Sequence, residues 1–369
     1  MSDEDWGASA LSVREGLRDA IAGGSEPGWR TAVATVTAVE ESAYRRPGAK
    51  RLVGGDARGG PLAALAERAA DGPVRETFDR TADDTEWGLG QNGVIDVLVE
   101  PADQSFRPAL ERVAEGERVA VLTVVGGDHP DAEVGARAVV GEEGSVETTE
   151  ARPSIPDGLL GAVRERAGEF AVTGRSATVE IETERGTADV FADGLEPVPE
   201  LLVFGHGEDV RPVVRLAREA GFRVTVAVED GARADPDEFP SAHEVVAVRP
   251  AEVAEVVSRP ADTYPVLMSH DFMADRQALA ALLETDVTYV GLMGPRKRFE
   301  AMRDELAEVD GELADEDAER IATPVGLDLG AGEPSQIALS VVAEVLAVSN
   351  ERDGGRLTDG EGPIHPRPE

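Results

Sequence analysis

LLVFGHGEDVRPVVRLAREAGFRVTVAVED, residues 201–230, is the stretch that decides the fold of the second half of the chain. Its opening apolar run predicts a buried strand, and Gly205 and Gly207 predict a tight turn. The residues that follow predict a helix over 210–220 and a second strand over 224–228. Short apolar strands that alternate with helices are typical of a parallel sheet covered on both faces. The stretch therefore predicts the first unit of a doubly wound, Rossmann-like α/β domain.

The alternation of strands and helices continues beyond this stretch. Further strands are expected over 244–248, 265–269 and 287–293, and helices over 251–258, 275–284 and 296–307. A glycine-rich turn and a long apolar helix follow within 323–348. We therefore expect a C-terminal domain over 201–350, a proline-containing linker over 196–200 before it, and a disordered tail over 351–369 after it.

The first half of the chain, residues 1–195, shows a different pattern. Strands are expected over 31–42, 49–53, 94–100, 118–125, 177–184 and 188–192, and helices over 11–22, 61–70 and 157–168. Here strands and helices do not alternate regularly. We therefore predict an N-terminal mixed α/β domain that contains more strand than helix.

Acidic side chains dominate the composition. The 369 residues include 73 aspartates and glutamates against 36 lysines and arginines, a formal net charge of −37. Such a surface repels nucleic-acid phosphates and anionic lipid headgroups, so we expect neither nucleic acid nor a membrane as a partner. Concentrated salt favours this composition, because about 1 M salt shortens the Debye length to roughly 3 Å. We interpret the charge as a halophile-like adaptation to the environment.

Features missing from the sequence narrow the chemistry further. The chain has no cysteine, which excludes disulfides, thiolate metal ligands and thiol catalysis. The five histidines show no metal-binding spacing, so we expect no metal ion held by side chains alone. No window reaches 18 apolar residues, and the first residues lack the pattern of a secretory signal. We therefore expect a cytoplasmic protein.

Glycines and polar residues follow several predicted strands of the C-terminal domain. Because the carboxyl ends of parallel strands meet at one edge, where open α/β sheets bind ligands, we expect these residues to line a crevice. Glycine lets the backbone approach a ligand, a helix N-terminus attracts an anion, and arginine suits a phosphate or carboxylate. The candidate cofactor-binding residues in this domain are Gly205, His206, Gly207, Glu229, His270, Asp271, Gly291, Gly294, Arg296, Asp328 and Gly330.

Simpler interpretations of these residues remain open. The glycine loop could be only a tight turn, since Val210 replaces the last glycine or alanine of the dinucleotide-binding fingerprint. Asp209, in the first turn of the helix, would cap it and repel a phosphate. His270 could contact a ligand, donate a proton or cap the next helix. His270 and Asp271 are the catalytic candidates, and the neighbouring Ser269 has no nucleophile elbow around it.

The order of these motifs resembles that of the XdhC/CoxI family. The GxG loop, MSHDFMAD (268–275), YVGLMGPRKR (289–298) and the segment 323–348 resemble its C-terminal Rossmann domain. AVATVTAVEESAYRRPGAKRLV (32–53) and FDRTADDTEWGLGQNGVIDVLVEP (78–101) resemble its N-terminal stretches. The resemblance thus extends over nearly the whole chain to about residue 350.

The resemblance implies an accessory factor for molybdenum hydroxylases of the xanthine dehydrogenase and carbon monoxide dehydrogenase type. Such a factor binds molybdenum cofactor, supports its sulfuration and delivers it to the apoenzyme. The implied partners are the molybdenum hydroxylase apoenzyme, a sulfurtransferase and a second copy of the chain in a homodimer. The resemblance also adds Arg46 to the candidate cofactor-binding residues, and it implies a cofactor chaperone rather than a turnover enzyme.

The chain departs from the family pattern where the family has cysteine. The family's Gly-Gly-Cys-Leu-Glu segment is absent, Gln91 stands in place of a second cysteine, and Glu41 replaces the glycine that opens the GSSxRRPGA motif. Glu229 lies one position beyond Val228, which stands where the family has an aspartate. Two alternatives follow: an NAD(P)-dependent oxidoreductase with His270 as proton donor, or a nucleotide-binding sensor that has lost the delivery role. The ligand is then NAD(P) instead of molybdenum cofactor.

Overall fold

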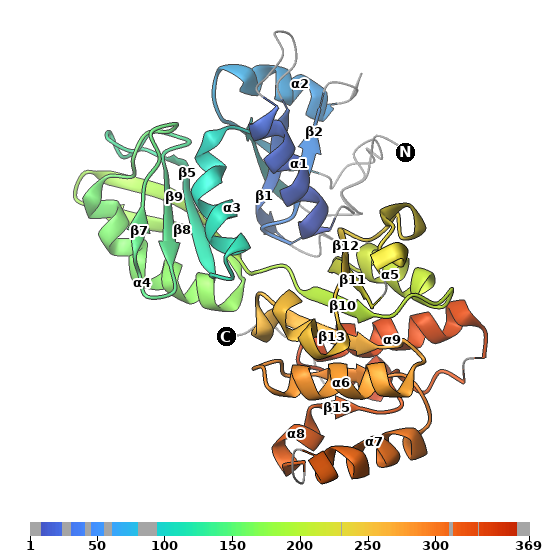
Figure 1. Cartoon of the computed structure of the whole chain (residues 1–369). Coiled ribbons are helices and arrows are strands. Elements are labelled where there is room, and N and C mark those ends of the chain that lie inside the picture. The colour runs from blue at the N-terminus through green and yellow to red at the C-terminus, as the bar shows by residue number, and fades with distance from the viewer. Residues whose placement is uncertain are drawn as a thin grey trace. The chain divides into compact units, whose positions relative to one another are not determined.

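The chain separates into two compact units, Met1–Pro197 and Val198–Glu369 (Figure 1). The computed structural model describes residues 9–23, 31–40, 46–54, 61–79, 94–229, 231–309, 313–330 and 332–359. Glu41, Arg45, Gln91 and the part of the expected tail from residue 360 onward lie outside these described residues. Each unit has its own sheets and core, so each is described by itself.

Within the described part of the C-terminal unit, six parallel strands form one sheet (Figure 1). They are β10 (Glu200–Phe204), β11 (Arg223–Val228), β12 (Glu244–Ala247), β13 (Thr263–Leu267), β14 (Val290–Leu292) and β15 (Ile321–Ala322). Their spatial order is β12-β11-β10-β13-β14-β15, so the order reverses between β10 and β13. This arrangement confirms the predicted Rossmann-like doubly wound sheet.

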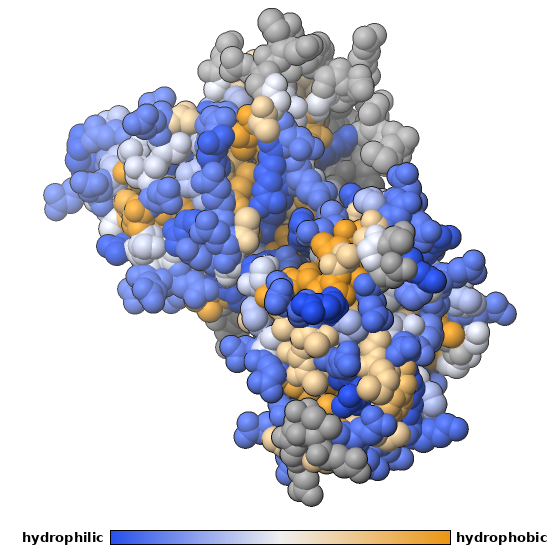
Figure 2. Space-filling view, in the orientation of Figure 1, coloured by the Kyte–Doolittle hydropathy of each residue, from blue (hydrophilic) through white to orange (hydrophobic). Residues whose placement is uncertain are grey.

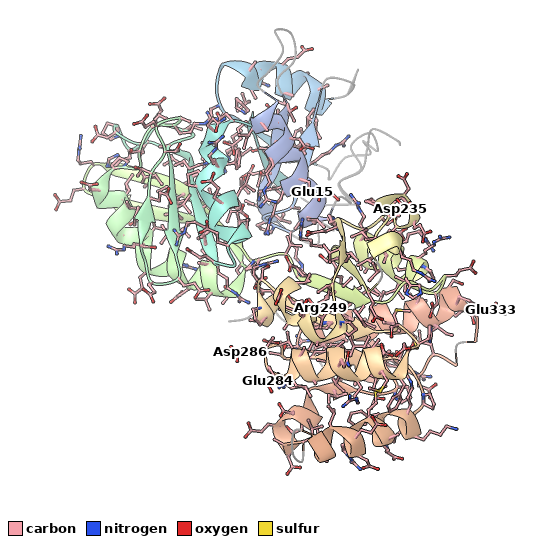
Figure 3. All side chains as sticks on the ribbon, in the orientation of Figure 1. Glu15, Asp235, Arg249, Glu284, Asp286 and Glu333 are labelled. Carbon is pink, nitrogen blue, oxygen red and sulfur yellow. The ribbon has the colours of Figure 1, made fainter. Side chains whose placement is uncertain are left out.

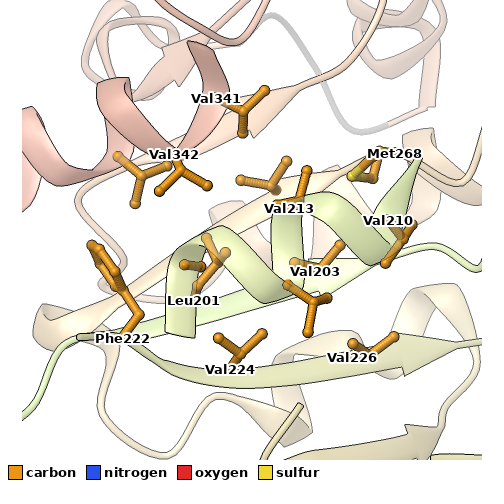
Figure 4. Packing of buried hydrophobic residues seen from close by; sticks show 14 of the residues in the cluster. Leu201, Val203, Val210, Val213, Phe222, Val224, Val226, Met268, Val341 and Val342 are labelled. Atoms are coloured by element: carbon orange, nitrogen blue, oxygen red, sulfur yellow. The ribbon is translucent and has the colours of Figure 1, made fainter. Parts of the chain in front are cut away.

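Helices cover both faces of this sheet. They are α5 (Val210–Glu219), α6 (Phe272–Leu283), α7 (Arg296–Val309), α8 (Asp315–Glu319) and α9 (Pro334–Ser349). Successive residues of a strand point to opposite faces. Leu201 and Val203 of β10 therefore pack in one core with residues of α5 and α9 (Figure 4), whereas Leu202 and Phe204 pack in another with residues of α6 and α7. The two cores fix β10 at the centre of the unit.

The N-terminal unit contains two antiparallel sheets, with strand orders β2-β1-β4-β3 and β7-β6-β5-β9-β8. The strands are β1 (Ala32–Glu40), β2 (Lys50–Val53), β3 (Val74–Asp79), β4 (Val94–Pro101), β5 (Val119–Gly127), β6 (Arg137–Gly141), β7 (Val146–Glu147), β8 (Ser176–Thr183) and β9 (Gly186–Leu195). The helices are α1 (Ala10–Ala22), α2 (Pro61–Arg68), α3 (Arg107–Ala114) and α4 (Asp157–Thr173). This unit is the predicted mixed α/β domain.

A buried charged pair joins the two sheets of the N-terminal unit. The guanidinium of Arg137 on β6 donates to both carboxylate oxygens of Glu100 on β4, at 2.6 and 2.7 Å. It also donates to the hydroxyls of Ser105, at 2.8 Å, and Thr123, at 3.3 Å from Nε and 3.2 Å from Nη2. The guanidinium lies 4.2 Å from the centroid of the Phe106 ring. The nearly buried guanidinium of Arg152 also lies 3.7 Å from Oε2 of Glu100, so the carboxylate faces two cations inside the unit.

Several predicted elements differ from the observed ones. The helix expected over 251–258 is a 3-10 helix, Pro250–Val256, confined between Pro250 and Pro260. Strand β3 was not predicted, because VRETFD is mostly polar, and strand β6, RAVVG, was also missed. The two-residue strands β7 and β15 also lack a readable pattern. Among the described helices, none combines the length and apolar character needed to cross a membrane.

Candidate functional site

The loops that follow β10, β13, β14 and β15 meet at one edge of the C-terminal sheet, because the strands are parallel neighbours. We call this region, formed by residues 205–209, 268–271, 293–297 and 323–330, the carboxyl edge. At its centre, the backbones of two loops touch. A Cβ at Gly205 would lie 2.6 Å from the carbonyl oxygen of Met268, so only glycine permits this approach. Gly205 therefore allows the loop after β10 to contact the loop after β13.

Asp209 and His270 form a hydrogen-bonded pair across the carboxyl edge. The Nε2 of His270 lies 2.8 Å from Oδ2 of Asp209, although the two residues are 61 positions apart. His270 has a left-handed backbone, with φ of 64°, which turns its ring toward the loop after β10. The pair is accessible, since 59% of the His270 side chain and 29% of the Asp209 side chain are exposed. The expectation that Asp209 caps α5 is wrong, because its side chain makes no hydrogen bond to that helix.

Asp271 caps α6. Its Oδ1 accepts a hydrogen bond of 2.8 Å from the backbone N–H of Ala274, as an N-cap aspartate does. The cap of α6 is thus Asp271, whereas His270 bonds Asp209. Both side chains lie at the carboxyl edge, as their sequence positions predicted.

A buried aspartate connects the loops after β13 and β14. Asp275 is fully buried, and its Oδ1 accepts hydrogen bonds from the hydroxyl and the backbone N–H of Ser269, at 2.5 and 3.2 Å. Its Oδ2 accepts from Arg298 at 2.7 Å, and Arg298 also donates to the carbonyl of Met293 at 3.3 Å. Neither Asp275 nor Arg298 is among the site residues predicted from the sequence. The sequence offered one indication for Arg298, which is its position two residues after Arg296 on α7. Helix positions two residues apart face different sides, so Arg298 does not share the orientation of Arg296.

Arg296 and Lys297, by contrast, are exposed at the start of α7. They follow Gly294, whose φ of 123° shapes the turn and whose missing side chain leaves room for Arg298. Hydrophilic residues occupy much of the visible surface (Figure 2), and exposed carboxylates such as Asp235, Glu284, Asp286 and Glu333 project from the C-terminal unit (Figure 3). Against that background, two adjacent exposed cations at the carboxyl edge are available to an anionic ligand.

The loop between β15 and α9 is held from inside the unit. Glu344 on α9 accepts hydrogen bonds from the Tyr289 hydroxyl at 2.8 Å and from the backbone N–H of Gly326 at 2.7 Å. Burial, and then the negative charge of Glu344, raise the pKa of the Tyr289 hydroxyl well above its usual range. Asp328 and Gly330 are exposed beyond these contacts, on the outer side of the loop.

Other predicted residues take different positions. Gly291 lies inside β14 rather than after it, and its missing side chain makes room for Val325, Tyr289 and Val266. Glu229 is exposed just beyond β11, and His206 is half-buried in the loop after β10. Arg46 is exposed and belongs to the N-terminal unit.

The residues around Arg46 are engaged in protein contacts. The Nζ of Lys50 lies 2.5 Å from the nearly buried carboxylate of Asp193, and Gly48 packs against Ser176. These two positions of the RRPGA(K) motif therefore stabilise the N-terminal unit. Within the described ranges, no three histidine, aspartate or glutamate side chains are close enough to bind a metal ion.

A parallel sheet with the strand order 3-2-1-4-5-6 and helices on both faces defines a Rossmann-like domain. Residues 201–345 match the family model described as the XdhC Rossmann domain. These residues therefore form an XdhC Rossmann domain, which confirms the resemblance to the XdhC/CoxI family found in the sequence.

Relatives extend this similarity to most of the chain. A Bacillus subtilis protein named as a probable xanthine dehydrogenase subunit is 27% identical over 335 residues, which span 85% of this chain and 92% of that protein. The uncharacterized protein YqeB of Escherichia coli is 30% identical over 183 residues, 49% of this chain and 32% of its own length. A Bacillus halodurans crystal structure described as a xanthine dehydrogenase has a TM-score of 0.64 at 25% identity, with 94% of this chain and 95% of that chain covered.

Proposed function

We propose that the chain is an accessory factor in the maturation of a molybdenum hydroxylase of the xanthine dehydrogenase type. The observation that carries this proposal is similarity over 85% of the chain to a protein named as a probable xanthine dehydrogenase subunit. The neighbouring crystal structure, which covers 94% of the chain, bears a related description. The proposed partner is the hydroxylase apoenzyme, and a sulfurtransferase and a second copy of the chain are further proposed partners.

In this proposal the carboxyl edge holds molybdenum cofactor, or another phosphate-bearing ligand, for transfer. Arg296 and Lys297 would bind the phosphate, since they are exposed cations beside the turn at Gly294. Asp275 and Arg298 would keep the two loops in position through their buried contacts. His270 and Asp271 would face the ligand, with no nucleophile assigned. Transfer requires moderate affinity, because each tenfold tightening adds about 1.4 kcal/mol that release must overcome.

An NAD(P)-dependent oxidoreductase is the second candidate. The strand order 3-2-1-4-5-6 favours it, since dinucleotide-binding domains share that order, and the exposed imidazole of His270 could donate a proton. This candidate requires turnover that consumes NADH or NADPH, with a pH dependence set by one histidine.

Deletion of the gene followed by a xanthine dehydrogenase assay tests the first proposal. We expect the dehydrogenase polypeptide to accumulate without molybdenum cofactor and without activity. Complementation with the double variant R296A/K297A should restore less activity than complementation with R303A, which removes an exposed cation farther along α7. A deletion strain with fully active dehydrogenase would refute the accessory role. NADH consumption by the purified protein would favour the oxidoreductase.

A further inference from the structure

The carboxylate of Asp209 occupies the place where an anion would approach the glycine loop. A Cβ on Gly207 would collide with Oδ1 of Asp209, so this carboxylate covers the open side of the glycine. His270 holds it there by the 2.8 Å hydrogen bond. In dinucleotide-binding domains, the second glycine of the loop lets the backbone approach a pyrophosphate. Here a negative charge of the protein itself fills that space.

The start of α5 also lacks donors that a pyrophosphate would need. The N–H of Val210, the first residue of the helix, donates to the carbonyl of Gly207 at 3.1 Å. Pro212, the third residue, has no N–H. Anions bind helix N-termini through such N–H groups, so the first turn of α5 is poorly equipped for one. The missing N–H donors and the Asp209 carboxylate both disfavour a pyrophosphate at the start of α5.

The opposite end of the carboxyl edge has the complementary charge. Arg296 and Lys297 follow β14, which lies two strands from β10. Adjacent strands are about 4.8 Å apart, so the ends of β10 and β14 lie roughly 10 Å apart along the edge. The edge thus has an acceptor end at Asp209 and a cationic end at Arg296.

We propose that Asp209 is a specificity-determining residue that excludes a dinucleotide diphosphate from the start of α5. This inference rests on the proposed function, because it concerns the ligand of the same site. The ligand class is a monophosphate whose hydroxyl or amine group donates a hydrogen bond to Asp209, while Arg296 and Lys297 bind its phosphate. His270 is a positioning residue in this arrangement, since it acts by holding the Asp209 carboxylate over Gly207.

Calorimetric titration of NADH against four forms of the full chain tests the inference, in about 1 M KCl to screen the net charge of −37. The forms are the unmodified protein, D209A, D209N and E208A. We expect NADH to bind the unmodified protein only at millimolar concentrations or not at all, and D209A to bind at least about tenfold more tightly. D209N should gain less NADH affinity than D209A, because its amide retains the volume of the carboxylate. E208A removes an exposed carboxylate one position away that does not cover Gly207, so it should gain much less affinity than D209A.

The outcomes separate this inference from the proposed function. Tight NADH binding by the unmodified protein, an unchanged D209A, or an equal gain in E208A would each overturn the exclusion by Asp209. Circular dichroism of each variant identifies any loss of fold, and H270Q, which leaves Asp209 in place but frees it, should show a smaller gain of the same sign. A deletion strain with active dehydrogenase would refute the accessory role and leave these NADH affinities unaffected.

Discussion

The pair Glu100–Arg137 in the N-terminal unit and the pair Asp209–His270 in the C-terminal unit use similar contacts in opposite surroundings. Both join acidic and basic side chains at less than 3 Å. The side chain of Arg137 is 1% exposed and that of Glu100 3%, with further bonds to Ser105 and Thr123. His270 is 59% exposed. Burial therefore distinguishes a charge that holds two sheets together from a charge that a ligand can reach.

The energetic consequence of each pair follows from this difference. Removing one partner of a buried pair leaves an uncompensated charge in the interior and costs about 3 to 5 kcal/mol. Exposed pairs contribute about 0 to 1 kcal/mol, because water and salt screen both charges. Replacement of buried partners should thus lower stability, whereas replacement of exposed residues at the carboxyl edge should change binding.

The largest expected effect is that of R137M. This variant keeps much of the side-chain volume but removes the two closest bonds of Glu100. Arg152 stays 3.7 Å from the carboxylate, so the free energy of unfolding of the N-terminal unit should fall by about 3 kcal/mol. Denaturant titration in molar salt measures this change. R107M is the matched control, because Arg107 is 55% exposed and only 4.0 Å from Glu111. Equal stability of the two variants would remove the distinction between buried and exposed pairs.

D275N tests the buried link between the loops after β13 and β14. The amide retains the shape of the carboxylate but loses the charge that faces Arg298, so we expect a loss of about 2 kcal/mol in the C-terminal unit. Thermal unfolding measures it, with D304N, an exposed position on α7, as the control. If D275N unfolds like the control, Asp275 does not hold the two loops together.

The stability contributed by the buried Tyr289 hydroxyl depends on pH. Its pKa is raised in the folded state, so the hydroxyl stays protonated there after it ionises in the unfolded chain. Stability from this group is present below the unfolded pKa of about 10 and is lost as the pH rises above it, by up to about 1.4 kcal/mol per pH unit.

The variant Y289F isolates this contribution. It should lose about 1 kcal/mol at neutral pH, through its lost hydrogen bond to Glu344, and should decline less steeply above pH 10 than the unmodified protein. Denaturant titrations at several pH values provide the measurement. Parallel declines of both proteins would show that Tyr289 does not ionise differently in the two states.

The smallest expected effect on stability is that of R296A/K297A. Both side chains are exposed, so the free energy of unfolding should change by less than about 0.5 kcal/mol. Equilibrium binding of molybdenum cofactor should nevertheless weaken about tenfold or more, because two charge-assisted contacts to the phosphate are lost. R303A should alter neither quantity. A large loss of stability with unchanged binding would show that these cations stabilise the fold and do not bind the ligand.

The sequence was sufficient to predict the C-terminal fold, because apolar runs, glycine turns and helical periods agree there. It also placed Gly205, His270 and Arg296 at one edge, since strand ends in a parallel sheet share an edge. The bond between Asp209 and His270 could not be predicted, because it depends on β10 and β13 being neighbours and on the positive φ of His270. Likewise, Arg298 differs from Arg296 only in helical orientation, and the depth at which Asp275 is buried depends on tertiary packing.

One titration tests most directly whether the exposed charge of the carboxyl edge binds the ligand: molybdenum cofactor added to the unmodified protein and to R296A/K297A, in about 1 M salt. We expect saturable binding by the unmodified protein and an affinity about tenfold lower in the folded double variant. Equal affinity in the two proteins, or no binding by the unmodified one, would contradict the assignment of this edge as the ligand site.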